Sequence, residues 1–466
     1  MKVNNRVFLV IVLTSLMGML GCRKDATTTI VVPETEVSIA FESGSMGKVI
    51  KISELNWKFE LANDNGNEQL PDAWRNWWYV KMNNVQTYIP IEITLSNRGW
   101  PYYYLPVYSY DQVHWSRFTE DEVSQNSEFE LVITKQFKNK DVWMARFYPY
   151  TYADMENHMD SIQNNTFVVR QTIGFSQDGK PIDVLKITNG GIPNTNKKRV
   201  LLHARTHPGE TPPSFLLEGM IDFLLSGSPE VSSILDEFEF HIFPMQNVDG
   251  VTVGNYRTTP KSQNLEVMWY YQNLNPIDLT EDSPLEVSVI HAYAQQLMTD
   301  GGPPVSMAFN LHASNSEPDI CPFFYPHFGT ESQGYSAREA ALWNKQLRFI
   351  DCLASHYGSD KLEPKPSEGG SSFASKTYPE SWWWVNFHDQ VMAMTFEMTY
   401  GQAGYAPDWI TPDELHQLGA DMVLAIRDYN DPDFVIIPSR QGQAERKTHL
   451  KYPELYPPDF EDESKR

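Results

Sequence analysis

The sequence predicts an α/β fold, with helices on both faces of a sheet, preceded by an antiparallel β-sandwich. Two patterns predict it. From about residue 153 onward, short apolar strands alternate with helix-like segments, which is typical of an α/β sheet. Between residues 37 and 152, short runs rich in Val, Ile, Tyr, Phe and Trp are separated by turn signals such as Asn63-Asp-Asn-Gly, which is typical of a sandwich. The 466 residues are enough for a core in each part.

Composition divides the chain into five segments. We expect a lipoprotein signal peptide at residues 1–22, a flexible spacer at 23–36, the β-sandwich domain at 37–152, the α/β domain at 153–430 and a C-terminal extension at 431–466. Sandwich strands are expected at residues 37–41, 77–82, 88–95, 129–134 and 142–148. In the α/β domain, strands are expected at 167–173, 184–188, 200–204, 238–244, 305–311 and 391–399, and helices at 154–163, 213–225, 285–298, 336–356 and 412–427.

The N-terminal segment has the pattern of a lipoprotein signal. Lys2 and Arg6 precede an apolar stretch at residues 7–20, which ends in Gly21-Cys22. A basic start, a short apolar run and a small residue before cysteine make Cys22 the expected lipidated first residue of the mature chain. The apolar run is short for a membrane-spanning helix. We therefore expect an exported protein of the cell envelope, periplasmic or at the cell surface, that meets the membrane only through a lipid anchor at Cys22.

Charge and cysteine content restrict the possible partners. Hydrophobic residues make up 41% of the chain and aromatic residues 13%, as in a folded protein. A net charge of −23 argues against binding to nucleic acid and gives no attraction to anionic lipid. Cys321 and Cys352 could form one disulfide or remain two free buried thiols.

Four of the expected α/β strands each run into polar residues. Strand 200–204 precedes His207 and Glu210, strand 240–245 precedes Asn247 and Asp249, strand 305–311 precedes His312, and strand 391–396 precedes Glu397. The carboxyl ends of strands in an open α/β sheet line one crevice, so these side chains should meet. Each residue alone also has a structural interpretation, since His-x-x-Glu pairs are common and a histidine at a strand end is often a core residue. Together, however, the two histidines and Glu210 form a ligand set for one zinc ion, with a fourth position free for water.

Glu397 lies inside an apolar strand, in Thr395-Phe-Glu-Met-Thr. Burial of a carboxylate there is costly unless it has a partner or a function. Near the water of a zinc site, it would serve as a general base that takes a proton and later returns it to the leaving amine.

Several ordered motifs resemble the zinc metallocarboxypeptidase family, in particular its cytosolic-carboxypeptidase-like branch. In the second domain they are Thr206-His-Pro-Gly-Glu-Thr, Pro244-Met-Gln-Asn-Val-Asp-Gly-Val, Gly254-Asn-Tyr-Arg and Thr395-Phe-Glu. In the first domain, Phe41-Glu-Ser-Gly, Trp77-Trp-Tyr-Val and Pro106-Val-Tyr-Ser-Tyr are similar to the β-sandwich that precedes the catalytic domain in that branch. The resemblance covers about residues 37–425 and implies a mixed-sheet, zinc carboxypeptidase-like catalytic domain.

The resemblance also implies roles for individual residues. His207, Glu210 and His312 would bind zinc, and Glu397 would be the catalytic base. Arg257, in Gly254-Asn-Tyr-Arg, would polarise the scissile carbonyl and stabilise the oxyanion.

One motif departs from the family. Where the family reads Asp-Leu-Asn-Arg-x-Trp, this chain has Asn264-Leu-Glu-Val-Met-Trp269, so that Glu266 replaces an asparagine and Val267 an arginine. The replaced pair would clasp the terminal carboxylate of the substrate. Either another cation, such as Arg205 or Lys261, takes over that carboxylate, or the substrate is not an ordinary peptide carboxyl terminus. Glu266 could instead meet an amine, such as the diamino-acid side chain of cell-wall peptide.

The family's substrate-capping tyrosine has two candidate positions. The resemblance best fits Tyr378, nineteen positions before Glu397, and Tyr400 is the alternative. Aromatic packing is the structural interpretation of either residue.

The sequence therefore predicts a zinc metallocarboxypeptidase that hydrolyses a peptide bond, or a peptide-like amide bond, by metal-activated water and a glutamate base. Two alternatives remain. One is a cell-wall peptide amidase or peptidase of the same fold, and the other is a zinc-containing binding protein without catalysis. The altered carboxylate clasp keeps both alternatives open.

Overall fold

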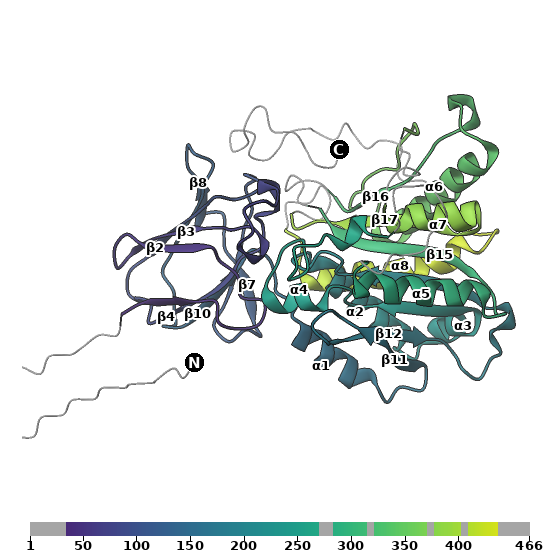
Figure 1. The fold of residues 1–466 in the computed structure, drawn as a ribbon, viewed down its shortest axis with the longest axis horizontal. Helices are drawn as coiled ribbons and strands as arrows, with labels where there is room; N and C mark the ends of the chain where they lie inside the picture. The colour runs from purple at the N-terminus through teal and green to yellow at the C-terminus, as the bar shows by residue number, and fades with distance from the viewer. Residues whose placement is uncertain (1–33, 270–282, 315–320, 371–376, 402–408, 437–466) are drawn as a thin grey trace, which may run out of the picture. The chain divides into compact units, whose positions relative to one another are not determined.

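The computed structural model describes residues 34–269, 283–314, 321–370, 377–401 and 409–436 (Figure 1). The predicted signal peptide with Cys22, most of the spacer and most of the C-terminal extension lie outside the described residues. In the described part of the chain, no helix combines the length and hydropathy that a bilayer span requires. Cys321 and Cys352 are both buried and free, which selects the thiol alternative over the disulfide.

Two five-stranded sheets form the predicted sandwich region (Figure 1). In order across the first sheet, the strands are β1 (Glu36–Ser38), β4 (Tyr79–Asn83), β10 (Val142–Ala145), β6 (Val107–Ser109) and β7 (Trp115–Arg117). In order across the second, they are β2 (Lys48–Lys51), β3 (Asn56–Glu60), β5 (Ile91–Ser96), β9 (Leu131–Lys135) and β8 (Val123–Gln125). Buried and partly buried residues alternate along β3, so that Trp57 and Phe59 face the core.

All strand pairs in these two sheets are antiparallel except β3 and β5, which are parallel. The exception has a topological cause. The chain leaves the second sheet after β3, forms β4 in the first sheet and then re-enters beside β3, and such a crossover allows parallel pairing. The predicted antiparallel character is otherwise confirmed.

A seven-stranded mixed sheet forms the second region, in the order β11-β12-β14-β13-β15-β17-β16. Its strands are β11 (Val168–Phe175), β12 (Pro181–Ile187), β13 (Lys198–Ala204), β14 (Phe238–Phe243), β15 (Val305–Ala313), β16 (Phe323–Tyr325) and β17 (Met392–Met398). The central strands β14, β13, β15 and β17 are parallel, and β11, β12 and β16 pair antiparallel with their neighbours. The mixed α/β fold class is therefore confirmed.

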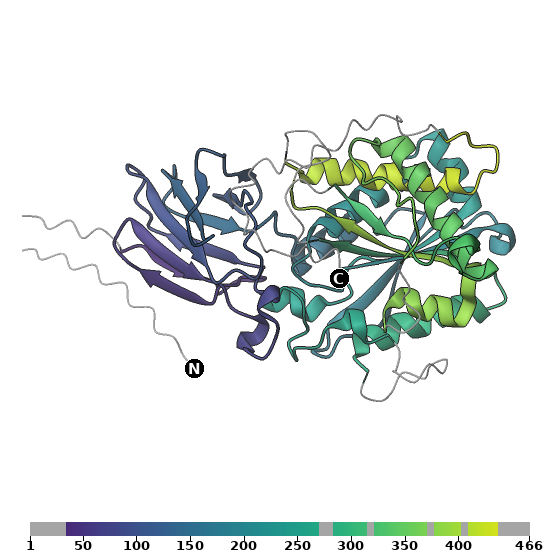
Figure 2. The ribbon, with the colours of Figure 1, turned by 90° about the horizontal axis from the view of Figure 1, so that it is seen from above.

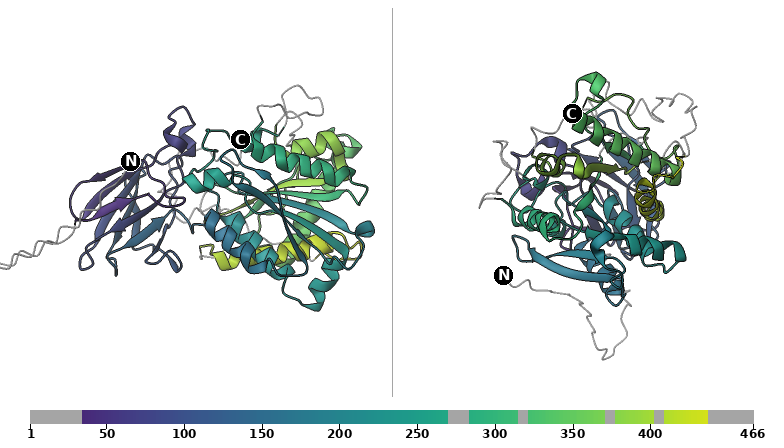
Figure 3. Two further views of the ribbon diagram at one scale, coloured as in Figure 1. Left: turned by 60° about the horizontal axis from the view of Figure 1, so that its bottom comes forward. Right: turned by 90° about the vertical axis from the view of Figure 1, so that its right-hand side faces the viewer.

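Helices cover both faces of this sheet (Figures 2 and 3). They are α1 (Tyr152–Ile162), α2 (Pro212–Leu224), α3 (Pro229–Glu237), α4 (Val248–Val253), α5 (Leu285–Thr299), α6 (Ala337–Tyr357), α7 (Pro379–Phe387) and α8 (Pro412–Tyr429). Side chains of α1, α2, α3, α6 and α8 belong to the core on one face, and those of α5 and α7 to the core on the other. The sequence did not predict α3, α4 and α7, which have only six to nine residues each.

Helix α2 is held close to α8 by glycine. A Cβ atom at Gly219 would lie 2.2 Å from the backbone of His416, and one at Gly419 would lie 2.1 Å from the carbonyl oxygen of Leu216. Neither position can therefore carry a side chain without separating the helices. Because α2 begins immediately after the loop that carries Glu210, this close packing fixes where that loop lies.

Candidate active site

Strand alternation directs the polar groups of the central strands to one face. On β15, Phe309 and Leu311 belong to the core against α2, α6 and α8, whereas His312 belongs to the opposite face. His312 pairs with Glu397 across the parallel ladder, and directly paired residues share a face. Strand β15 continues through Ala313, so His312 lies within the strand and not after its end as predicted.

The loop after β13 carries the other two predicted ligands, and Arg205 holds it in place. Arg205 is fully buried, has a backbone φ of +59° and donates to the carbonyl oxygen of Pro208. It also donates at 2.9 Å to the carbonyl oxygen of Tyr150 and at 2.9 Å to the hydroxyl of Ser214. Arg205 therefore supports the loop and does not project toward a substrate, which corrects its candidacy as the replacement carboxylate clasp.

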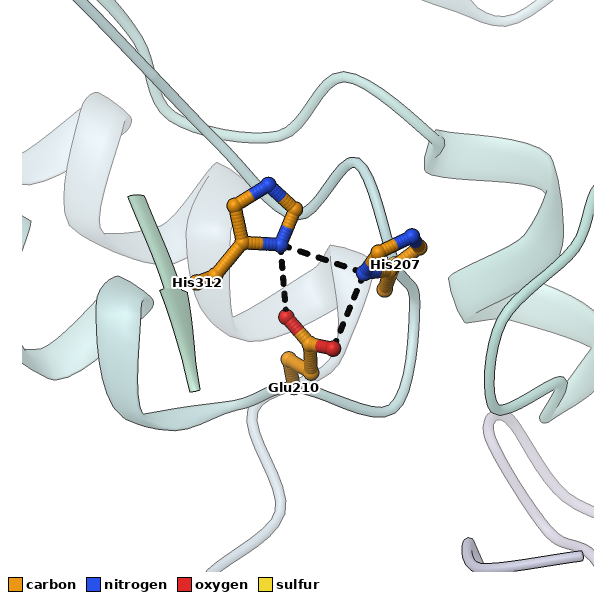
Figure 4. A group of neighbouring side chains, drawn as sticks. All are labelled: His207, Glu210 and His312. Carbon is orange, nitrogen blue, oxygen red and sulfur yellow. Dashed lines mark hydrogen bonds and ion pairs between the residues drawn. The ribbon is translucent and has the colours of Figure 1, made fainter. Parts of the chain in front are cut away.

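The structure brings His207, Glu210 and His312 together (Figure 4). Nδ1 of His207 lies 2.9 Å from Oε1 of Glu210, and Nδ1 of His312 lies 2.9 Å from Oε2. The two Nδ1 atoms are 3.1 Å apart. All three side chains are buried, and Ala313 donates its N–H at 3.1 Å to Oε2 of Glu210.

The outer ring nitrogens show which tautomer each histidine adopts. Nε2 of His207 lies 3.1 Å from Oδ1 of Asn264, and because that oxygen also accepts the backbone N–H of Glu266, it is the acceptor of this contact. Nε2 of His312 lies 3.1 Å from Oε2 of Glu266. Both Nε2 atoms therefore donate, and in a neutral ring each Nδ1 then has a free lone pair.

Three acceptors consequently converge with no shared proton among them. If Nδ1 of His312 carried a proton, it could donate to Glu210. Nδ1 of a neutral His207 would still face the Glu210 carboxylate, and neither of these two groups could then donate a hydrogen bond to the other. A cation at the centre satisfies every contact. At zinc–ligand distances of about 2.0–2.2 Å, two ligands of a tetrahedral ion lie about 3.3–3.6 Å apart, slightly more than the 2.9–3.1 Å between these atoms. The donor set and its spacing therefore fit zinc.

The charges of the site match this arrangement. Burial and the nearby Arg257 guanidinium lower the pKa of His207, which keeps that ring neutral. Burial alone would lower the pKa of His312, but Glu266 and Glu210 raise it well above its ordinary value. For Glu210 the directions are reversed. Burial would raise the pKa of this carboxylate, but the two histidines hold it well below its usual range. The cluster attracts positive charge, whether a proton or a metal ion.

Glu397 lies beside the cluster and is only partly buried. Desolvation raises the pKa of Glu397 to about 8, while the charge of His312 opposes that rise. A carboxyl group with this pKa can both accept and return a proton near neutral pH.

Arg257 lies near the site, on a loop that is held in place by contacts with the predicted sandwich region. Its guanidinium lies 5.5 Å from the ring centroid of Trp74. Desolvation raises the pKa of both Glu397 and Tyr378, and the charge of Arg257 opposes that rise. Asp64 accepts the backbone N–H of Arg257 at 2.8 Å and those of the residues on either side at 2.6 and 2.7 Å. Because Asp64 belongs to the predicted sandwich domain, that region helps to position the arginine.

The predicted substrate-binding residues lie near the same cluster. Glu266 is buried, and both of its carboxylate oxygens are engaged, one by His312 and the other by Asn310 at 2.9 Å. Val267 is 42% exposed. Tyr378 precedes α7, and Glu266 and Arg257 both influence its pKa, which places it near them. Tyr400 is instead buried, and its ring packs edge-to-face against Phe147. Substrate binding by Tyr378 and Val267 stays a prediction.

Two contributors to the site were not predicted from the sequence. Asn264 faces His207, and Asp64 fixes the Arg257 loop. Glu380 is a buried neighbour of the site whose carboxylate accepts a hydrogen bond from the hydroxyl of Thr395 at 2.9 Å. Burial and the charge of Glu266 raise the pKa of Glu380 to about 7. A sequence signal existed for Asn264, which occupies the position of the family's aspartate in Asn264-Leu-Glu-Val-Met-Trp269, and none existed for Asp64.

Comparison with known proteins identifies the family. Residues 37–147 match the family model for the cytosolic carboxypeptidase N-terminal domain, and residues 155–278 match the model for zinc carboxypeptidase. The chain belongs to the zinc carboxypeptidase family. The chain is 27% identical to cytosolic carboxypeptidase 2 of Mus musculus over 323 residues, which cover 60% of the chain and 37% of the relative.

Two further comparisons extend over more of the chain. It is 26% identical to cytosolic carboxypeptidase 2 of Xenopus tropicalis over 434 residues, which cover 84% of the chain and 41% of the relative. The chain thus spans less than half the length of these two curated relatives. A metallo-carboxypeptidase structure from Burkholderia cenocepacia shares the fold, with a TM-score of 0.70, 21% identity and coverage of 85% of this chain and 99% of that one.

These relatives correct the predicted location. We expected an exported protein, anchored by lipid at Cys22, but the matched curated relatives are named cytosolic carboxypeptidases, which contradicts a place at the cell envelope. The expectation depended on a short basic and apolar pattern, and such a pattern describes composition without showing that it is read as a signal. The cell-wall alternative loses the support that it drew from this location.

Proposed function

We propose that this chain is a zinc-dependent metallocarboxypeptidase that hydrolyses a peptide or peptide-like amide bond. One observation carries the proposal. Nδ1 of His207, Nδ1 of His312 and the carboxylate of Glu210 are buried and converge on one point, where a single cation would meet all three. The family match supports zinc as that cation.

His207, Glu210 and His312 would hold one zinc ion. Bound there, zinc supplies a Lewis acid and lets water act as a nucleophile at neutral pH. The N–H of Ala313 and the side chain of Asn264 keep the ligands oriented through hydrogen bonds to Glu210 and His207.

Glu397 would be the general base. It shares a sheet face with His312 on the neighbouring strand, and its pKa of about 8 suits a group that takes a proton from the attacking water and returns it to the leaving amine. Arg257 would stabilise the negative charge that develops on the carbonyl oxygen, since its guanidinium keeps its charge throughout the reaction.

Replacement of Glu397 by glutamine tests this function. The Glu397→Gln variant should bind as much zinc as the parent and hydrolyse a panel of peptides about 10²- to 10⁴-fold more slowly. Glu286→Gln is the matched control, because Glu286 is a buried glutamate whose carboxylate instead accepts hydrogen bonds from Gln177. Equal rates for the parent and Glu397→Gln would overturn the assignment of the base.

A zinc-containing binding protein without turnover is the second candidate. Val267, at the position of the family's carboxylate-binding arginine, favours it, because an isopropyl group forms no ion pair with a substrate terminus. If the parent holds zinc but hydrolyses no peptide in the panel, this candidate replaces the first.

A further inference from the structure

Glu266 is the side chain whose surroundings the proposed reaction does not explain. It lies on a short 3-10 helix, Leu265–Val267, and is buried. Its oxygens accept from Nε2 of His312 at 3.1 Å and from Nδ2 of Asn310 at 2.9 Å. Since Asn310 and His312 are two residues apart on β15, both donors come from the same face of one strand.

This geometry fixes the His312 ring. A carboxylate only accepts hydrogen bonds, so Nε2 of His312 must carry the proton, and Nδ1 then points its lone pair at His207 and Glu210. The bond from Asn310 holds the Glu266 carboxylate in turn, which prevents it from rotating away. A histidine that donates to a carboxylate is a more basic and better oriented metal ligand.

The two histidines differ in this respect. His207 donates to the neutral amide of Asn264, whereas His312 donates to a carboxylate two residues further along. The family motif Asp-Leu-Asn-Arg has its acidic residue at the position of Asn264, and this chain has it at Glu266 instead. The negative charge of the motif has therefore moved from the His207 side of the site to the His312 side.

We propose that Glu266 is a positioning residue of the metal site, which orients His312 and strengthens zinc binding, and that it does not read a substrate amine. This inference rests on the proposed zinc function. It also explains why a glutamate replaces the asparagine of the family motif, because the Glu266 carboxylate forms hydrogen bonds with His312 and Asn310 inside the protein.

The test is the zinc dissociation constant of the full chain, measured by competition with a chromogenic chelator. Glu266→Ala should raise that constant about 10- to 100-fold. Glu266→Gln keeps an acceptor oxygen without the charge and should fall between the parent and Glu266→Ala. The visible spectrum of the cobalt-loaded protein should also shift in Glu266→Ala, because it reports the ligand geometry.

Glu380→Gln is the matched control. Glu380 is a buried glutamate of the same region, but its carboxylate accepts from Thr395 and not from a histidine. Its zinc dissociation constant should stay close to that of the parent. The melting temperature of each metal-free variant shows whether the fold is retained, and if Glu266→Ala does not fold, the comparison uses Glu266→Gln.

The outcomes separate the two proposals. A parent that binds no zinc contradicts the proposed function itself. A parent that binds zinc, with Glu266→Ala and Glu266→Gln binding it equally well, contradicts only the role of Glu266. Equal weakening in Glu380→Gln would also overturn it, because it would show a general effect of local negative charge.

Discussion

Two buried clusters of histidine and glutamate lie on the same face of the seven-stranded sheet, at opposite ends of β13. Near the start of the strand, Arg199 pairs with Glu239 at 2.9 Å and with Asp300 at 2.9 Å, and His241 contacts the same Glu239 at 2.9 Å. Near its end, His207, Glu210 and His312 converge. The first cluster contains its own cation. In the second, the ion pairs of Glu210 in the described part of the chain are with the two histidines alone.

This difference distinguishes a structural cluster from the proposed metal site. A buried carboxylate is stable when a fixed guanidinium compensates its charge, and burial is costly when nothing does. The composition of the two clusters is similar, so histidine and glutamate content alone does not distinguish them. What distinguishes them is whether a positive side chain already occupies the centre.

The largest expected effect comes from breaking the structural cluster. Arg199→Met leaves Glu239 and Asp300 without their cation and should lower the free energy of unfolding by about 3–5 kcal/mol. Denaturant unfolding measures this, and the zinc content of the folded fraction should stay unchanged. Loss of zinc without loss of stability would show that the two clusters are not independent.

The structural cluster should also make stability depend on pH. Burial would raise the pKa of Glu239, but His241 and Arg199 lower it to about 2, from an ordinary 4.5. A lowered carboxyl pKa stabilises the fold above the unfolded pKa, so about 3 kcal/mol should be lost as pH falls from 4.5 toward 2. Glu239→Gln should flatten the unfolding free energy over this interval. An unchanged slope would contradict the assignment.

Loss of a residue from the proposed metal cluster should have the opposite effect, because zinc binding should change while the stability of the metal-free protein should not. His312→Ala should remove zinc binding while the metal-free fold stays intact. In the parent, zinc at 100 times its dissociation constant should stabilise the fold by about 2.7 kcal/mol, and His312→Ala should lose this increment. Thermal unfolding with and without zinc measures it. Equal stabilisation of the parent and His312→Ala would place the ion elsewhere.

The smallest expected effect comes from a comparison of the hydrogen-bond partners of His207 and His312 in the proposed metal site. Asn264→Ala removes the neutral partner of His207 and should weaken zinc binding about tenfold, at the lower end of the range for such partners. This is less than the effect expected for Glu266→Ala, because an amide accepts a weaker hydrogen bond than a carboxylate. The reverse order, measured by chelator competition, would show that His207 depends more on its partner than His312 does.

The sequence predicted the parts of the site that follow from strand order. His207, Glu210, His312 and Glu397 each lie at or near the end of an apolar strand, and parallel pairing of β13, β15 and β17 places such ends together. The longer helices and most strands of the seven-stranded sheet were predicted because their apolar patterns are long enough to identify. The sequence did not predict β2, β3, β6, β7, β8 and β16, which have only three to five residues each. The family resemblance supplied Arg257, which no local pattern shows.

The remainder depends on contacts between distant segments. Asp64 meets Arg257 across 193 residues, and Glu266 meets His312 across 46. Neither pairing has a local sequence signal, because each is created when a loop docks against a sheet. The added negative charge at Glu266 was visible in the sequence, but its partner was not. The sequence therefore suggested a substrate amine as that partner, whereas in the structure the carboxylate contacts His312.

The zinc content of the purified chain tests the account most directly. After incubation with zinc and dialysis, elemental analysis should find one zinc ion per parent chain and almost none in His312→Ala, while His241→Ala keeps the full amount. A parent chain without zinc, or equal zinc in the parent and His312→Ala, would contradict a metal site formed by His207, Glu210 and His312.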